Sequence, residues 1–171
     1  DQLSFHLDIL LCIPEEIAKI NHLKAAMVYK GSSDSLAQII SELTVAITDI
    51  ESPFYGTISN NWNISNPEGY ALWFESKMKL AEDLLKERLR IEKAIKIDDL
   101  PAYKWKTPLQ QVVQILKRHR DIMFLDQPQE IKPISIIITT LSAEAYQGEL
   151  ELADALRNIL KNMPGLISGQ K

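Results

Sequence analysis

The sequence has a single cysteine, no long apolar run and no basic signal segment. Its one cysteine among 171 residues, Cys12, lies in an apolar stretch and has no second cysteine for an internal disulfide. Nothing therefore requires an oxidising compartment, and we expect a cytoplasmic setting. No stretch approaches the roughly 20 apolar residues that a membrane-spanning helix needs. We accordingly expect no membrane partner.

The sequence also has no excess of positive charge. It carries 19 Lys and Arg against 23 Asp and Glu, for a net charge of −4. Such a chain does not attract a polyphosphate in bulk, which argues against long nucleic acid as a partner. A hydrophobic content of 46% is sufficient for a buried core. The first residue is not Met and strand-like residues follow at once, so we expect part of a larger protein to precede Asp1.

The N-terminal segment SFHLDIL, residues 4–10, has the alternation of a β-strand. Its large apolar residues face one side, while His6 and Asp8 face the other. A carboxylate is costly to bury on a strand unless a partner or a metal compensates its charge. Two interpretations remain open: a solvated Asp8 on an edge strand, or a buried Asp8 with such a partner.

Proline and glycine positions, together with hydrophobic periodicity, divide the next 60 residues into predicted helices, a strand and loops. A helix is predicted from Pro14–Glu16 to about Met27, and a break at 30–34. An amphipathic helix around 36–43 and a strand within TVAITDIE follow, and residues 52–67 are predicted to be loop-rich.

The rest of the chain has helical patterns. Residues 67–96 form a long predicted helix with Asn66 as N-cap, and 98–106 form a linker. Thr107 is predicted to cap a helix that reaches about Phe124. A last helix is expected to stop at Pro164-Gly165.

The segment KPISIIITTLSAEAYQGE, residues 132–149, is ambiguous between strand and helix. Its β-branched run favours a strand, but helical spacing places Ser135, Thr139, Ser142 and Tyr146 on one face. We therefore predict a buried helix that starts at Pro133. Ser135 would lie in the first turn, where free backbone N–H groups favour an anion. The alternative is that these hydroxyls bond to their own backbone.

Lys117 is the residue of interest in the basic run KRHR, residues 117–120. Four consecutive helical residues spread around the helix, so the run is not one basic face. Lys117 follows Val113 by four and borders the apolar stripe, so its stem can pack while its ammonium reaches a cleft. A solvated lysine is the ordinary alternative. Lys117 and Ser135 together would suit a phosphate.

The blocks 106–124 and 132–149, with FHLDIL and WNISNPEGYALWF upstream, resemble the cGAS/DncV-like nucleotidyltransferases, the bacterial CD-NTases of antiphage defence. A weaker likeness extends to animal oligoadenylate synthetases. The resemblance covers residues 4–13 and about 58–160. It implies an α+β fold: the end of a polymerase-β-like nucleotidyltransferase core over residues 1–66, followed by a mostly helical lobe over 67–171.

The resemblance also implies an activity. Such enzymes join ATP, GTP or other nucleoside triphosphates into a cyclic di- or trinucleotide second messenger and release pyrophosphate. Asp8 matches the third catalytic carboxylate, which binds Mg²⁺, while Lys117 and Ser135 match the residues that contact the donor phosphates. The resemblance leaves room for an activating protein partner.

The chain departs from the family pattern in several places. A Gly-Ser motif and two carboxylates should precede Asp8, so we expect this chain alone to be inactive. Gly31-Ser32 with Asp49–Glu51 imitates that motif, but the gap is too long. Leu11 stands where the family often has proline, and residues 20–44 match nothing in it. Two alternatives to the enzyme remain: an inactive nucleotide-binding or scaffold relative, and a helical interaction domain.

Overall fold

The computed structural model describes two compact units that meet within one long helix. The residues it describes are 12–29, 31–57, 59–93, 106–128 and 131–168. The first unit ends at Trp73 and the second begins at Phe74. This junction lies inside helix α3, Pro67–Lys93, whereas the sequence predicted a division before Pro67. The predicted strand 4–10, with Asp8, lies outside the described residues.

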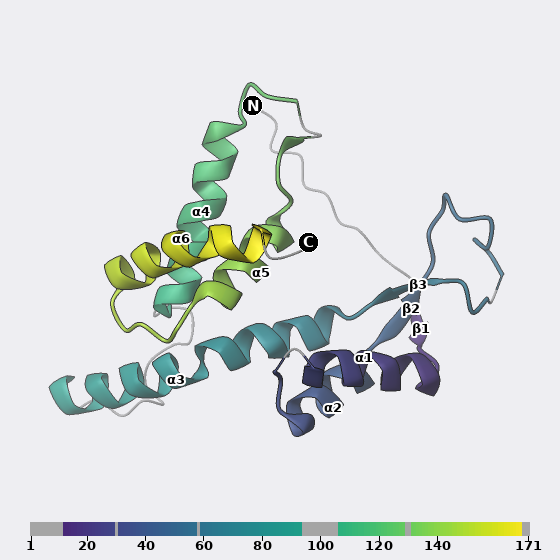
Figure 1. Ribbon diagram of the computed structural model, residues 1–171, viewed down its shortest axis with the longest axis horizontal. Coiled ribbons are helices and arrows are strands. Elements are labelled where there is room, and N and C mark those ends of the chain that lie inside the picture. Colours follow the sequence, from purple (N-terminus) through teal and green to yellow (C-terminus); the bar gives the residue numbers. More distant parts are fainter. Residues whose placement is uncertain (1–11, 30, 58, 94–105, 129–130, 169–171) are drawn as a thin grey trace. The chain divides into compact units, whose positions relative to one another are not determined.

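The first unit contains a small antiparallel sheet and a pair of helices. Strands β1, Cys12–Pro14, β2, Val45–Ile47, and β3, Asn63–Ser65, pair in the order β1-β2-β3 (Figure 1). Helices α1, Ile17–Tyr29, and α2, Asp34–Glu42, pack against each other. Register places Ala46 of the central strand between Ile13 and Ile64. The described part of this unit is thus an α+β arrangement with a helical hairpin between β1 and β2.

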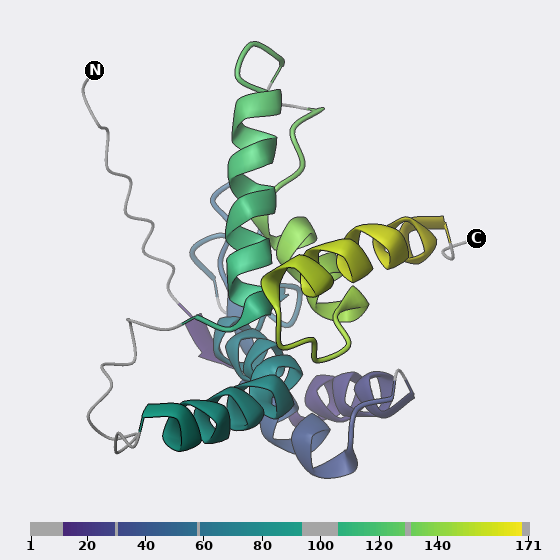
Figure 2. The same cartoon turned by 90° about the vertical axis from the view of Figure 1, so that its left-hand side faces the viewer.

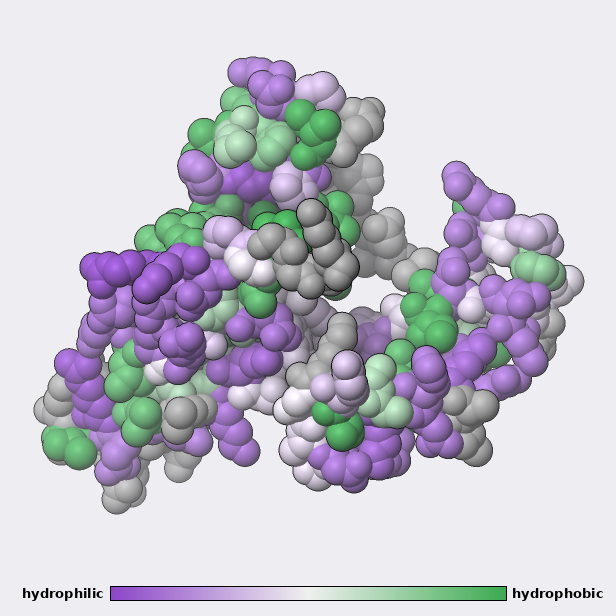
Figure 3. Space-filling model, viewed as in Figure 1, coloured by the Kyte–Doolittle hydropathy of each residue, from purple (hydrophilic) through white to green (hydrophobic). Residues whose placement is uncertain are grey.

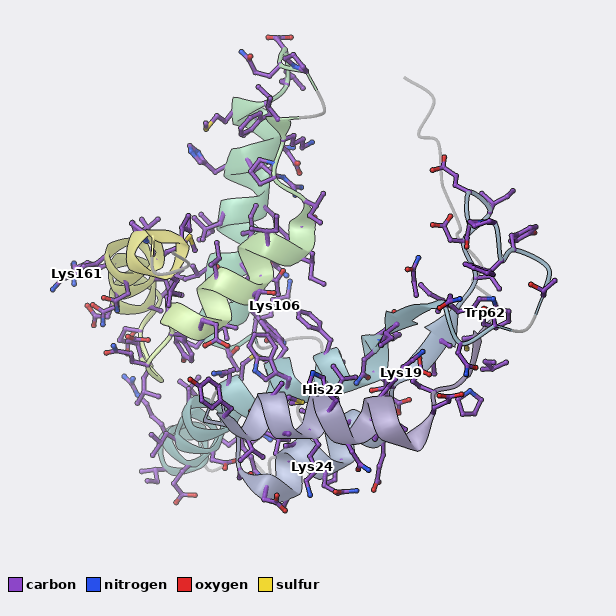
Figure 4. The ribbon with its side chains drawn as sticks, turned by 45° about the vertical axis from the view of Figure 1, so that its right-hand side comes forward. Lys19, His22, Lys24, Trp62, Lys106 and Lys161 are labelled. Carbon is purple, nitrogen blue, oxygen red and sulfur yellow. The ribbon has the colours of Figure 1, made fainter. Side chains whose placement is uncertain are left out.

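A buried carboxylate ties α1 to the sheet. Glu15 is buried, and its backbone N–H donates to the Thr44 carbonyl at 3.2 Å. Its Oε1 pairs with the Lys19 ammonium at 3.1 Å, which also donates to the Asn60 carbonyl at 2.8 Å. Figure 4 shows Lys19 and Trp62 at the same end of the unit. Lys19 therefore links the start of α1 to the connection between β2 and β3.

Asn66 joins three segments of the first unit. Its Oδ1 accepts from the Gly69 N–H at 2.8 Å, which caps α3 as the sequence predicted. Its Nδ2 donates to the Ile40 carbonyl at 2.7 Å and to Thr44 Oγ1 at 3.1 Å. A Cβ at Gly69 would overlap the Asn66 side chain, so this position requires glycine.

The second unit is a helical bundle. Helices α4, Pro108–Met123, α5, Ser135–Ala145, and α6, Leu152–Ser168, pack pairwise, and both ribbon views show them crossing (Figures 1 and 2). The second part of α3 contributes the buried residues Met78 and Ala81. Leu109, Val112 and Ile159 are fully buried in its core.

The cap of α4 also confirms a sequence prediction. Thr107 Oγ1 accepts from the Gln110 N–H at 3.4 Å, and Gln110 Oε1 accepts from the Thr107 N–H at 3.0 Å. The reciprocal bonds form a capping box. The Thr107 hydroxyl also donates to Met78 Sδ at 3.0 Å, which attaches the start of α4 to α3.

Two local predictions were wrong. The first helix begins at Ile17, because Pro14 pairs with Val45 in the sheet. Helix α6 continues through Pro164 to Ser168, although a proline inside a helix removes one backbone bond and crowds the carbonyl four residues earlier. The region 52–67 is loop-rich as predicted, apart from the three-residue strand β3. None of the described helices is long and apolar enough to cross a bilayer.

Candidate functional site

Two of the three predicted site residues lie in the second unit. Lys117 is half-buried in the middle of α4, and Ser135 is the exposed first residue of α5. Asp8 lies outside the described residues, so its place relative to these two is not part of the geometry. Both Lys117 and Ser135 belong to helices that pack against each other.

Arg120, three residues after Lys117, makes the contact to Ser135. Its Nη1 donates to Ser135 Oγ and to the Pro133 carbonyl, each at 3.0 Å. On the other edge, its Nε and Nη2 donate to Asp121 Oδ1 at 3.0 and 2.7 Å. The guanidinium thus spans the gap between α4 and the start of α5.

Asp121 is held by two cations. Hydrogen bonds from Arg120 and then from Lys132 hold the pKa of the Asp121 carboxyl below its usual range. The Lys132 ammonium lies 3.0 Å from Asp121 Oδ1. With Lys117, the local set contains three cations and one carboxylate. This excess of positive charge suits an anionic ligand.

Ser135 is placed to donate as well as to accept. Arginine has only donors, so Ser135 Oγ accepts from Arg120 and its own proton points elsewhere. The N-cap residue Ile134 makes no side-chain capping bond, and its carbonyl accepts from the Ile137 N–H at 3.2 Å, so the first turn of α5 has no side-chain cap. The first-turn N–H groups and the helix dipole favour an anion beside Ser135.

Lys117 shares a face of α4 with Arg120. Residues three apart are neighbours on a helix surface, so the two cations lie on one side. The Lys117 side chain makes no hydrogen bond or ion pair in the part of the chain that the structure describes. Its ammonium is therefore available for a ligand, while that of Lys132 is engaged by Asp121.

The other hydroxyls of the predicted face are buried. Thr139 Oγ1 donates to the Ser135 carbonyl at 2.9 Å, and the Tyr146 hydroxyl donates to the Glu149 carbonyl at 2.7 Å. Burial, and then the charge of Glu149, raise the pKa of Tyr146 to about 12. Ser142 is fully buried and its Oγ has no hydrogen-bond partner among the described residues. Of the predicted hydroxyl face, only Ser135 is exposed.

Gly31-Ser32 and Asp49–Glu51, which imitate the family's Gly-Ser motif, form no cluster of metal ligands in the described part of the chain. Gly31 has a positive φ of 94° in the turn between α1 and α2. Asp49 and Glu51 are exposed after β2, where Asp49 Oδ1 accepts from the Glu51 N–H at 3.0 Å. Among the described residues, no three His, Cys, Asp or Glu side chains gather as metal ligands do.

Sequence reasoning missed Arg120, Asp121 and Lys132. It treated 117–120 as a run spread around the helix and selected Lys117 alone. The i, i+3 spacing of Lys117 and Arg120 was a usable signal that the two share a face. The contact between Arg120 and Ser135 could not be predicted from the sequence. It depends on the path of the connection from Phe124 to Pro133, which brings the chain back to α4.

Comparison with known proteins gives one informative similarity. The chain is 35% identical, over 102 residues, to a protein named c-di-GMP synthase from Roseivirga ehrenbergii. The matched stretch is 60% of this chain and 26% of that relative. The chain thus spans about a quarter of the length of the relative that it matches. No family model and no solved structure matches the chain.

Proposed function

We propose that this chain is part of an enzyme that joins nucleoside triphosphates into a cyclic dinucleotide. The observation that carries the proposal is the 35% identity, over 102 residues, with a c-di-GMP synthase. The resemblance of the two helical blocks to the cGAS/DncV-like nucleotidyltransferases supports the same reaction class. We further propose membership of that family and a signalling role in antiphage defence, with a cyclic di- or trinucleotide as product.

The proposed reaction is nucleotidyl transfer. A ribose hydroxyl oxygen of one nucleotide attacks the α-phosphorus of another, a phosphodiester bond forms, and the bond to the β-phosphate breaks. The hydroxyl proton is lost and pyrophosphate leaves. Ring closure repeats the step, so each cyclic dinucleotide accounts for two pyrophosphates. The substrates are GTP, ATP or a related pair.

Lys117 and Ser135 are the proposed contacts to the donor triphosphate. The Lys117 ammonium, at the surface of α4, would supply a charge-assisted hydrogen bond worth on the order of 1.5–3 kcal/mol, or about ten- to a hundredfold in affinity. Ser135 would donate a neutral bond from the first turn of α5. Lys117→Ala should therefore weaken nucleotide binding more than Ser135→Ala does. Arg118→Ala, at an exposed neighbouring position, is the matched control.

Asp8 is the proposed ligand for Mg²⁺ in this chain. When bound, magnesium would supply the positive charge that favours ionisation of the attacking hydroxyl and offsets the charge of the leaving pyrophosphate. Asp8 would be one of its ligands, and the other carboxylates would come from residues that this chain does not contain. In the full-length protein, Asp8→Asn should lower product formation by orders of magnitude without unfolding the protein. Near-normal turnover by this variant would remove Asp8 from the site.

The deciding experiment uses the full-length protein with GTP, ATP and both together in the presence of Mg²⁺. Mass spectrometry of the products and a pyrophosphate assay should give a cyclic di- or trinucleotide with one pyrophosphate for each nucleotide in the ring. Nucleotide-dependent thermal stabilisation without any product would instead favour the inactive nucleotide-binding relative. Absence of both product and stabilisation would favour a helical interaction domain.

A further inference from the structure

We propose that Arg120 is a positioning residue, which fixes the Ser135 hydroxyl for contact with a nucleotide phosphate. This inference rests on the proposed function, because it concerns how the same phosphate site is held. Arg120 is the residue that bridges α4 to the first turn of α5. Sequence resemblance assigned it no role.

The donors of the guanidinium are nearly all committed to the protein. Arginine has five N–H donors, and four contacts to Pro133, Ser135 and Asp121 are present. The side chain is 12% exposed. A group so occupied has little left to offer a phosphate directly. Arg120 therefore acts through the residue that it holds.

The bond to Ser135 determines what that hydroxyl can do. Because Arg120 can only donate, the Ser135 oxygen uses a lone pair on it and keeps its own proton for a third group. Without Arg120, the hydroxyl could rotate and accept from, or donate to, other neighbours. The exposed Ser135 proton is thereby kept for an acceptor outside the protein, such as a phosphate oxygen.

A second contact fixes the position of the helix end. Arg120 also donates to the carbonyl of Pro133. Pro133 and Ser135 flank the N-cap residue Ile134, so the two Arg120 bonds hold the chain on both sides of it. They set the distance between the start of α5 and the face of α4 that carries Lys117. Asp121, itself held by Lys132, fixes the opposite edge of the guanidinium.

The test is a double-mutant cycle on nucleotide affinity in the full-length protein. Binding of GTP with Mg²⁺ is titrated for wild type, Arg120→Gln, Ser135→Ala and the double variant. Arg120→Gln should weaken binding about two- to tenfold, the worth of one neutral hydrogen bond. In the Ser135→Ala background the same change should cost clearly less than in wild type, because the part of the loss that acts through the Ser135 hydroxyl is already gone. Arg118→Ala should leave affinity unchanged.

A second variant tests the geometry of the side chain. Arg120→Lys keeps the charge but cannot reach Ser135, Pro133 and Asp121 with one planar group. It should therefore lose about as much affinity as Arg120→Gln. Wild-type affinity for Arg120→Lys would show that only the charge matters, and the positioning role would be rejected. Thermal unfolding of every variant separates a general loss of stability from this effect.

The outcomes separate this inference from the proposed function. Independent, additive losses for Arg120→Gln and Ser135→Ala would overturn positioning and indicate that Arg120 acts by another route. If Lys117→Ala and Ser135→Ala weaken binding and Arg120→Gln does not, the positioning role alone fails. If none of the three changes affinity, the phosphate site itself fails and the role of Arg120 fails with it.

Discussion

The two units of the chain bury different kinds of side chain. In the second unit, the largest fully buried side chains include Leu109, Val112 and Ile159. Among the described residues of the first unit, the largest fully buried side chains are those of Thr44 and Ser41, beside the buried apolar residues Ala37, Ile40 and Ala46. Figure 3 shows that hydrophobic side chains also reach the surface of the second unit at the end of α4, where Ile122 and Met123 are about 60% exposed.

This difference indicates two ways of stabilising a small unit. Burying one large aliphatic side chain contributes about 1.5–3 kcal/mol, and such burial is non-directional. Hydrogen bonds contribute about 0.5–1.5 kcal/mol each but fix the position of the groups that they join. The second unit should thus be the more sensitive to truncation of apolar side chains. The first should be the more sensitive to loss of Asn66, which makes three of its hydrogen bonds.

The largest expected effect is in the core of the second unit. Leu109→Ala should lower the free energy of unfolding by about 2–5 kcal/mol, because a fully buried side chain leaves a cavity. Ile115→Ala, at a 41% exposed position on the same helix, should cost much less. Urea unfolding measures the loss, and hydrogen exchange should locate it in α4–α6. Equal losses for the two variants would contradict the buried core.

A smaller effect is expected at Asn66 in the first unit. Asn66→Ala removes the cap of α3, so the Gly69 N–H loses its acceptor, and it removes the donor that links α3 to the Ile40 carbonyl and Thr44, at a cost of about 1–3 kcal/mol. Asn66→Asp keeps the cap but cannot donate to the Ile40 carbonyl, so its loss should be intermediate. Asn61→Ala, at an exposed position, is the control. Hydrogen exchange should increase in α2 and the start of α3. Faster exchange confined to α4–α6 would argue against this assignment.

The smallest expected effect is a pH dependence at Tyr146. Burial keeps its phenol protonated in the folded chain to a pKa of about 12, against 10.0 in the unfolded chain. Its contribution to stability is therefore complete below pH 10 and is lost as the pH rises toward about 12. Tyr146→Phe should start less stable, since the bond to the Glu149 carbonyl is gone, but decline less over this range.

A charge-neutral variant separates the two causes of this pH dependence. Glu149→Gln should keep most of the alkaline decline, because burial contributes more than the Glu149 charge to the raised pKa. Urea unfolding at several alkaline pH values provides the measurement. Parallel declines for wild type and Tyr146→Phe would show that Tyr146 does not control alkaline stability.

Local signals were sufficient for most helices of the fold. Thr107, with Gln110 three residues later, predicted the start of α4, and the spacing of Leu109, Val112 and Val113 predicted its buried face. The same reasoning identified α5 in spite of its β-branched residues, because its hydroxyls repeat with helical spacing. These signals lie within one element, so a single sequence contains them.

Features that depend on tertiary contacts were not predictable in the same way. Strand β3 is three residues long and is defined by pairing with β2, which its own sequence does not encode. The candidate site was only partly identified for a similar reason. Lys117 and Ser135 were selected from position and resemblance, whereas the bond from Arg120 to Ser135 spans 15 residues through a connection without periodicity. Asp8 and the carboxylates expected before it stay predictions.

The junction at Asn66 has a consequence for the recognition of distant relatives. The side chain must both accept and donate, which disfavours aspartate and alanine, and a Cβ three positions later would overlap it. A chain that retains this junction should therefore show Asn-Xaa-Xaa-Gly at the start of its long helix, even where the rest of the sequence has diverged. Substitution of one of the two residues should be accompanied by a change in the other.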